Sequence, residues 1–195
     1  MKTNTQVKIS ALFLILYFFS CFALSDELKL NKMSKKEQKI SYLSLDLDYS
    51  FYKKTVEQLN THLKTSLKNR GEAHITVITP PEFKIITEKI SSDSLKQEWV
   101  NWKNKNFENI CIGSGSIKTK GKTISTYYVV TKAESLFNFR QYLKSKYKLD
   151  HFNAELFFPH ITLGFTDRDL HYEDGVQKDI HSCLNLDIKL PEGHK

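Results

Sequence analysis

Two β-branched runs that each carry the triplet His-Ile-Thr constrain the fold of this chain most strongly. The first is AHITVIT, residues 73–79, and the second lies within ELFFPHITLGFT, residues 155–166. Such residues favour strands, and Pro80-Pro81 ends the first run because proline cannot continue a strand ladder. Each run follows a long amphipathic segment, so the chain contains a loose internal repeat of an amphipathic segment followed by a strand. We interpret the two halves as related lobes that face a common cleft.

The two segments before these runs have the spacing of helices with one buried face. Residues 51–68 and 133–147 each place apolar side chains at positions i, i+3, i+7 and i+11. These side chains are Val56, Leu59, Leu63 and Leu67 in the first segment and Leu136, Phe139, Leu143 and Tyr147 in the second. Arg70-Gly71 is expected to stop the first helix.

The remaining segments indicate one more helix and several strands. Residues 40–48 alternate apolar and polar side chains, which predicts a half-buried strand. Ser94 and Gln97 form a capping-box pattern that predicts the start of a short helix. Residues 110–130 are expected to form two strands joined by a Gly turn, and residues 184–190 are weakly strand-like. Residues 113–116 are expected to form a plain turn, while Lys118, Lys120 and Lys122 fit either a solvated hairpin tip or a basic rim for a polyanion. Because a hairpin pairs its strands antiparallel, we predict the α+β fold class rather than a doubly wound parallel sheet.

The alternation of side chains along a strand places the histidine and threonine of each triplet where they could act together. Side chains two residues apart point to the same face of a strand, so His74 shares a face with Thr76, and His160 with Thr162. Histidine titrates near neutral pH, so one imidazole can act as the base and the other as the acid in opening a phosphodiester. Threonine hydroxyls can donate to the non-bridging oxygens. This chemistry needs no cofactor and no metal, and the four residues are the predicted catalytic set.

The two His-x-Thr-x motifs resemble those of the two-histidine (2H) phosphoesterase superfamily, and residues 71–80, GEAHITVITP, look closest to its Swiss army knife, RNA-repair-like branch. The resemblance implies a bilobal α+β fold, in which two antiparallel sheets line a central cleft and helices lie outside. It implies that His74 and His160 act as general base and acid, in an order left open, and that Thr76 and Thr162 hold the phosphate. The implied substrates are RNA ends or nucleotides with a 2′,3′-cyclic phosphate, and oligonucleotides with 2′-5′ linkages.

The expected function is therefore metal-independent hydrolysis of a 2′,3′-cyclic phosphate. One alternative is a secreted module that captures nucleotides or RNA ends without turnover, using the same residues. A metallohydrolase is disfavoured, because no carboxylate or third histidine lies at ligand spacing beside either motif. Tyr128 and Phe165 are candidates for stacking on a base, although strand aromatics are more often part of a core.

The N-terminal segment has the pattern of a secretory signal. Lys2 and Lys8 precede an apolar run over residues 11–24, and Ala23-Leu24-Ser25 offers small residues before a cleavage point. We therefore predict a signal peptide over residues 1–25 and a secreted or periplasmic protein. The alternative is a membrane anchor made by the same segment.

The rest of the chain is predicted to form a flexible entry segment, residues 26–38, and a single bilobal domain, residues 39–195. We expect a monomer without a stable membrane partner. The formal charge of +7 is compatible with RNA or a nucleotide as the ligand. Cys111 and Cys183 could form a disulfide in an exported protein or remain two buried thiols, and the sequence leaves this choice open.

Overall fold

A computed structural model describes residues 42–194. The predicted signal peptide, the predicted entry segment over residues 26–38 and the predicted start of the domain at residue 39 lie outside the described residues. In chain order the elements are β1 (Leu43–Leu47), α1 (Tyr49–Leu63), β2 (Ala73–Ile78), α2 (Pro80–Thr87), α3 (Ser92–Asn101), β3 (Glu108–Thr119), β4 (Lys122–Lys132), α4 (Glu134–Tyr147), β5 (His160–Phe165) and two 3-10 turns, Tyr172–Asp174 and Ile180–Ser182.

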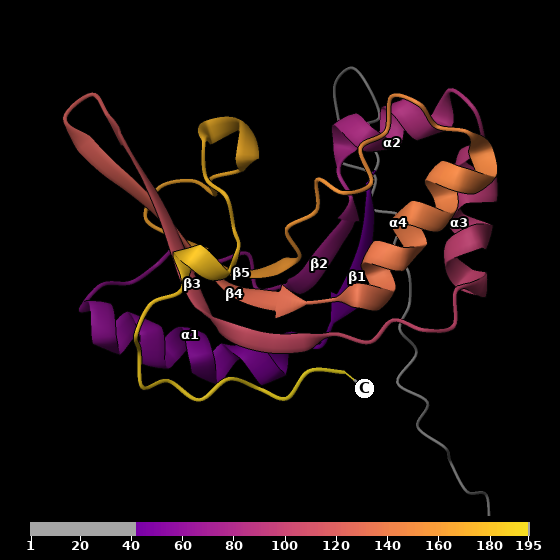
Figure 1. The fold of residues 1–195 in the computed structure, drawn as a ribbon. Helices are drawn as coiled ribbons and strands as arrows, with labels where there is room; N and C mark the ends of the chain where they lie inside the picture. The colour runs from indigo at the N-terminus through magenta and orange to yellow at the C-terminus, as the bar shows by residue number, and fades with distance from the viewer. Residues whose placement is uncertain (1–41, 195) are drawn as a thin grey trace, which may run out of the picture.

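The strands of this part of the chain form one antiparallel sheet in the order β1-β2-β5-β4-β3 (Figure 1). The predicted α+β class is confirmed. The predicted pair of sheets in a bilobal arrangement is not confirmed, since residues 42–194 show a single five-stranded sheet. The reason is that β2 and β5, the strands with the two motifs, pair directly, with Ile75 opposite Ile161.

One face of the sheet is apolar and forms the core. Leu45, Ile75, Ile161 and Val129 lie in a row across four strands, and none is more than 3% exposed. They belong to one hydrophobic cluster with the buried faces of α1 and α4. Burial of each such side chain stabilises the fold by about 1.5–3 kcal/mol. In Figure 1, α1 lies along the sheet, while α2, α3 and α4 gather at one end of it.

Helix boundaries follow local capping. The side chain of Asp48 accepts a hydrogen bond from the Ser50 amide and starts α1, and Lys64, in the left-handed region (φ 51°), ends it. The helix is thus shorter than the predicted 51–68. The start predicted at Ser94 was wrong, because Ser91 is the N-cap of α3 and accepts the Ser94 amide.

Helix α2 was not predicted. Pro80-Pro81 ends β2 as expected, but proline also suits the first turn of a helix, where its missing amide hydrogen is not needed. Thr79 and Glu82 complete a capping box, with the Thr79 amide 2.9 Å from the Glu82 carboxylate. That box was the sequence signal for α2.

The β3–β4 hairpin turns at Lys120-Gly121, which both have positive φ. The hairpin tip expected around Lys118, Lys120 and Lys122 is confirmed, whereas the turn predicted at residues 113–116 was wrong, because these residues lie inside β3. The glycines are needed there because residues 169–184, here called the strap, cross the strand. A Cβ on Gly113 would lie 2.7 Å from the Ser182 hydroxyl oxygen, and one on Gly115 would collide with Val176.

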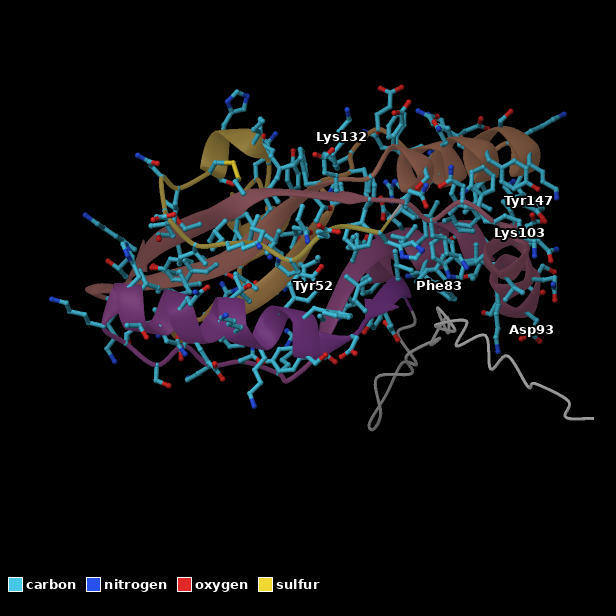
Figure 2. All side chains as sticks on the ribbon, turned by 90° about the horizontal axis from the view of Figure 1, so that it is seen from below. Tyr52, Phe83, Asp93, Lys103, Lys132 and Tyr147 are labelled. Atoms are coloured by element: carbon cyan, nitrogen blue, oxygen red, sulfur yellow. A yellow bond between two sulfur atoms is a disulfide. The ribbon has the colours of Figure 1, made fainter. Side chains whose placement is uncertain are left out.

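A disulfide joins Cys111 on β3 to Cys183 at the end of the strap (Figure 2). The pairing that the sequence left open is therefore present in the structure. The Leu184 amide donates to the Ile112 carbonyl at 2.8 Å, which adds a main-chain contact beside the disulfide. Residues 184–190 form no strand of their own, contrary to the weak prediction.

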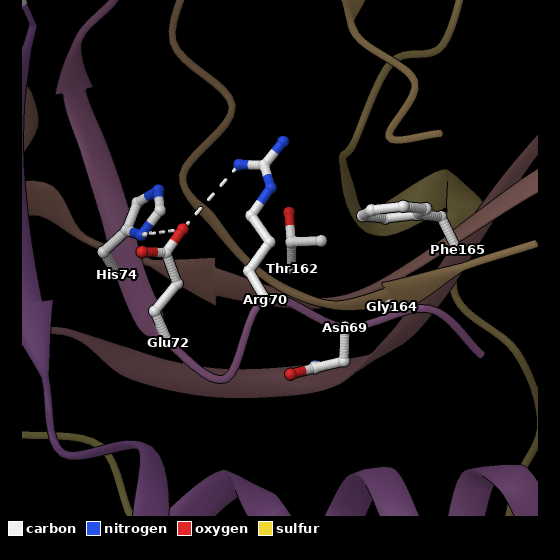
Figure 3. A pocket seen from close by; sticks show the side chains of 7 residues that line it. All are labelled: Asn69, Arg70, Glu72, His74, Thr162, Gly164 and Phe165. Carbon is white, nitrogen blue, oxygen red and sulfur yellow. Dashed lines mark ion pairs between the residues drawn. The ribbon is translucent and has the colours of Figure 1, made fainter. Parts of the chain in front are cut away.

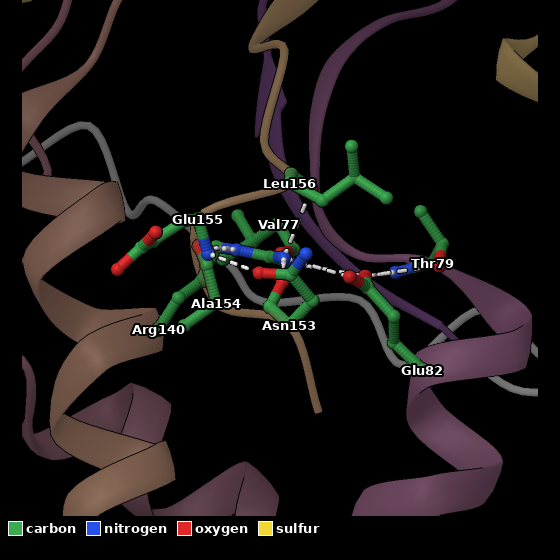
Figure 4. Close-up of polar contacts among 8 residues, drawn as sticks. All are labelled: Val77, Thr79, Glu82, Arg140, Asn153, Ala154, Glu155 and Leu156. Carbon is green, nitrogen blue, oxygen red and sulfur yellow. Dashed lines mark hydrogen bonds and ion pairs between the residues drawn. The ribbon is translucent and has the colours of Figure 1, made fainter. Parts of the chain in front are cut away.

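Strand β5 begins at His160 rather than at residue 155. Before it, the backbone is irregular because the buried side chain of Arg140, 1% exposed, binds the carbonyls of Asn153, Ala154 and Leu156 at 2.9–3.1 Å (Figure 4). These carbonyls are consequently unavailable to a strand ladder. No helix within residues 42–194 is both long and apolar enough to cross a membrane.

Candidate active site

Two rows of side chains cross the polar face of the sheet. Because Ile75 lies opposite Ile161 in an antiparallel pair, His74 faces Thr162 and Thr76 faces His160. With the neighbouring strands, the rows are Asp46, His74, Thr162, Tyr128 and Ser44, Thr76, His160, Val130. The four predicted catalytic residues therefore lie side by side. The two histidines sit on a diagonal, for which the expected separation of neighbouring side chains is about 7–8 Å.

His74 lies at a solvent-accessible edge of this arrangement, with its side chain 18% exposed. Its Nδ1 is 3.9 Å from the Glu72 carboxylate, whose same oxygen is 3.8 Å from the Arg70 guanidinium (Figure 3). The strand also places Asp46 directly beside His74 on β1. Acidic groups thus flank this imidazole on two sides.

The residues before β2 reach the site because the chain bulges there. Lys68 pairs with Phe165, and Ile75 pairs with Ile161. Between these two pairs the chain advances seven residues before and into β2 but only four residues along β5. The extra residues form a loop over residues 69–72, which turns at Gly71 with a positive φ of 68°. Gly164 lets the loop approach β5, since a Cβ there would lie 2.9 Å from the Lys68 carbonyl oxygen. This loop holds Arg70 and Glu72 beside His74.

A small pocket open to solvent lies between this loop and β5 (Figure 3). It is lined by Asn69, Arg70, Glu72, His74, Thr162, Gly164 and Phe165. One residue of each motif therefore reaches the same pocket. The Arg70 guanidinium lies 5.9 Å from the centre of the Phe165 ring.

The two aromatic candidates occupy different places. Phe165 lines the pocket and is partly exposed. Tyr128 is fully buried, and its ring meets that of His160 edge-on, with centroids 5.7 Å apart. Tyr128 therefore supports His160 from within the protein and does not line the pocket.

Both ring nitrogens of His160 have partners. Nδ1 lies 2.7 Å from the Phe158 carbonyl oxygen, and Nε2 lies 3.1 Å from the Lys178 ammonium. A carbonyl only accepts and an ammonium only donates, so Nδ1 carries the hydrogen and Nε2 offers its lone pair to Lys178. The contacts thus fix a neutral imidazole with one defined tautomer.

Asp169 connects Lys178 to the second motif. One carboxylate oxygen accepts from Lys178 at 3.0 Å and from the Thr126 hydroxyl at 2.7 Å, and the other accepts from the Thr162 hydroxyl at 3.1 Å. The side chains of Lys178 and Asp169 are only 3% and 5% exposed. Sequence reasoning missed both residues, because neither stands in a motif and only the fold of the strap brings them to the site.

The surroundings affect the two histidines differently. Burial lowers the pKa of His74, and the charges of Glu72 and Asp46 raise it part of the way back, while Arg70 lowers it. Burial also lowers the pKa of His160, and here the nearby Lys178 charge lowers it further. Burial opposes ionisation of Asp169, but Lys178 and the Thr126 hydrogen bond prevail and lower its pKa to about 2.

The comparisons with known proteins agree with this geometry. Residues 41–171, more than half of the chain, match the family model described as Swiss Army Knife, 2H phosphoesterase domain. No curated protein and no solved structure matches the chain. Within the described residues there is no cluster of three or more histidine, cysteine or acidic side chains placed to hold a metal ion.

Proposed function

Because this chain belongs to the Swiss Army Knife family of 2H phosphoesterases, we propose that it hydrolyses 2′,3′-cyclic phosphates at RNA ends or on nucleotides, without a metal. The observation that supports this most is the diagonal arrangement of His74 and His160, each with a motif threonine opposite it. A phosphate between the two imidazoles would have a base on one side and an acid on the other.

The different surroundings suggest the role of each histidine. His160 is neutral and presents the lone pair of Nε2, so it suits the base that takes a proton from the attacking water. His74 lies between Glu72 and Asp46, which favour its protonated form, so it suits the acid. Water then bonds to phosphorus, one ring P–O bond breaks, and His74 gives its proton to the departing ribose oxygen. The product is a phosphate monoester beside a free hydroxyl.

The two threonines also differ. The Thr162 hydroxyl already donates to Asp169, whereas no hydrogen bond within residues 42–194 engages the Thr76 hydroxyl. We therefore assign Thr76 as the main donor to a non-bridging phosphate oxygen. Thr162 would keep its place beside Asp169 and line the pocket.

Phe165 and Arg70 extend the site beyond the phosphate. The Phe165 ring is an apolar surface at the pocket, and base-aromatic stacking contributes about 1–3 kcal/mol per base. Arg70 is exposed and could contact a phosphate of an RNA chain. Together they support RNA or a nucleotide as the ligand.

A panel of substrates tests the proposal. The purified protein is incubated in EDTA with 2′,3′-cyclic mononucleotides, short RNAs ending in a cyclic phosphate and 3′,5′-cyclic mononucleotides. We expect turnover of 2′,3′-cyclic compounds and none of the 3′,5′-cyclic ones. Activity that appears only after a divalent metal is added would contradict the mechanism.

One observation favours the alternative of binding without turnover, namely that Lys178 already occupies His160 Nε2. Calorimetry with a 2′,3′-cyclic mononucleotide, followed by product analysis of the same sample, separates the two functions. Heat of binding with the ligand recovered intact would favour a binding module. Recovery of the ring-opened monophosphate would favour the enzyme.

We also propose that the protein works outside the cytoplasm, as a monomer. The Cys111–Cys183 disulfide supports an oxidising compartment. Mass spectrometry of protein recovered from an exporting host tests this, and the expected N-terminus is Asp26. A mass that includes residues 1–25 would instead support a retained anchor.

A further inference from the structure

We infer that the buried pair of Lys178 and Asp169 is a positioning device for the second motif, in which Lys178 holds the ring of His160 and Asp169 holds the hydroxyl of Thr162. The catalytic meaning of this inference rests on the proposed function. Neither Lys178 nor Asp169 belongs to either His-x-Thr motif, and both are contributed by the strap, residues 169–184.

The Lys178 contact fixes the ring of His160 from one side. Its ammonium is 3.1 Å from Nε2, while the Phe158 carbonyl holds Nδ1 at 2.7 Å on the other side. The Tyr128 ring contacts both groups: its centroid is 5.7 Å from that of the His160 ring and 5.2 Å from the Lys178 nitrogen. The imidazole is therefore held at both nitrogens and along one edge. Rotation of the ring would break two hydrogen bonds.

The Asp169 contacts fix the threonine in the same way. Its carboxylate accepts the Thr162 hydroxyl at 3.1 Å and the Thr126 hydroxyl at 2.7 Å, so it links β5 to β4. It also accepts from Lys178 at 3.0 Å. Every side-chain hydrogen bond of the pair, apart from the Thr126 bond and the one within the pair, ends on a motif residue.

The fold holds the strap firmly over the sheet. Val176 packs into the space left by Gly115, with Ile124 and Leu170 around it, and the disulfide ties Cys183 to β3. A buried ion pair often adds little stability in comparison with apolar side chains, because both charges lose their hydration. Stability alone is therefore a poor reason for this pair, whereas the positioning of His160 and Thr162 accounts for its two hydrogen bonds to the second motif.

The arrangement has a consequence for the proposed reaction. His160 can take a proton from water only at Nε2, so Lys178 must release that lone pair as the substrate enters. The charged or titratable groups around His160 are Lys178, Asp169, His171 and Tyr128, whose ring contacts the imidazole. Of these, Asp169 favours the imidazolium, while Lys178 and His171 oppose it. Burial and the Lys178 charge together keep His160 neutral in the substrate-free protein.

Histidine ring NMR on the substrate-free protein tests the inference, using Lys178→Met, Lys178→Arg and the double variant Lys178→Met/Asp169→Asn. The double variant removes both charges, so it avoids leaving an unpaired buried carboxylate. Lys132→Met, an exposed lysine on β4, is the matched control. Thermal unfolding confirms that each variant is folded.

In the wild type we expect the Nδ1–H tautomer of His160 and a neutral ring to well below pH 6.5. In the folded Lys178→Met variant the pKa of His160 should rise by roughly one to two units, while Lys178→Arg and Lys132→Met should leave it unchanged. The double variant should show a smaller rise, because it also loses the Asp169 charge, which raises this pKa. A wild-type Nε2–H tautomer, or an unchanged titration of His160 in the folded Lys178→Met variant, would overturn the inference. Because no substrate is present, this result is independent of whether the protein turns over a cyclic phosphate.

Discussion

At the scale of single residues, His74 and His160 stand in the same tripeptide but have different neighbours. Strand alternation predicted that each histidine shares a face with a threonine, and the register places all four on one face. The identical triplets could not show which histidine is the base and which is the acid, because the charged neighbours that distinguish the two imidazoles come from other parts of the chain. Glu72 belongs to the loop before β2, and Lys178 lies 18 residues beyond His160.

The low pKa values of both histidines predict an acidic optimum for kcat/KM. The base, His160, must be neutral, which holds down to its strongly lowered pKa. The acid, His74, must be protonated, and its pKa lies below the ordinary 6.5. Activity should therefore fall as the pH rises through the pKa of His74, below about pH 6.5.

Glu72→Gln should move that fall to lower pH, because the Glu72 charge raises the pKa of His74. Asp46 and Asp169 also raise it and Arg70 lowers it, so the shift should be partial. The pH profile of kcat/KM measures it, with the exposed Glu57→Gln on α1 as the control. A shift of the alkaline limb to higher pH would contradict the role given to His74 as the acid.

At the scale of elements, Arg140 decides where β5 begins. The sequence predicted a strand from residue 155, since ELFF is apolar and aromatic. It could not predict that a guanidinium on α4 would bind the carbonyls of this segment, together with the Val77 carbonyl at 2.8 Å and Glu82 at 2.7 Å (Figure 4). Propensity predicted the existence of most helices and strands, whereas their ends depended on such contacts and on caps.

Arg140→Met should destabilise the protein by about 3–5 kcal/mol, because it leaves buried carbonyls and Glu82 without their donor. The rings of Phe152 and Phe157, both within 4.9 Å of the guanidinium carbon, would also lose a cation–π partner. Urea unfolding measures the change, with Lys144→Met on the same helix as the control. Equal stability of the two variants would show that Arg140 is not the organising residue of this region.

At the scale of the whole molecule, the strap and the single sheet together make the site. The repeated motif predicted two halves that meet, but not that β2 and β5 would pair within one sheet. The strap contains no predicted element, so its position over β3 and β4 could not be foreseen. In the sequence, only Gly113 and Gly115 indicated a close approach, and glycines at this spacing are equally typical of a turn.

Removal of the Cys111–Cys183 disulfide should lower stability by about 4 kcal/mol, from the chain entropy of the loop it closes, whose ends are 72 residues apart. Denaturant unfolding of Cys111→Ser/Cys183→Ser measures this loss. Dithiothreitol should lower the stability of the wild type and leave that of the double variant unchanged. An equal effect of dithiothreitol on both proteins would contradict a stabilising disulfide.

The most direct test of the central claim is the hydrolysis rate of a 2′,3′-cyclic mononucleotide in EDTA by the wild type, His74→Ala and His160→Ala. Each substitution removes a proton-transfer group, so kcat should fall at least about 100-fold in both. The matched control, His151→Ala, removes an exposed histidine and should retain the wild-type rate. Wild-type rates in either motif variant would contradict the two-histidine mechanism.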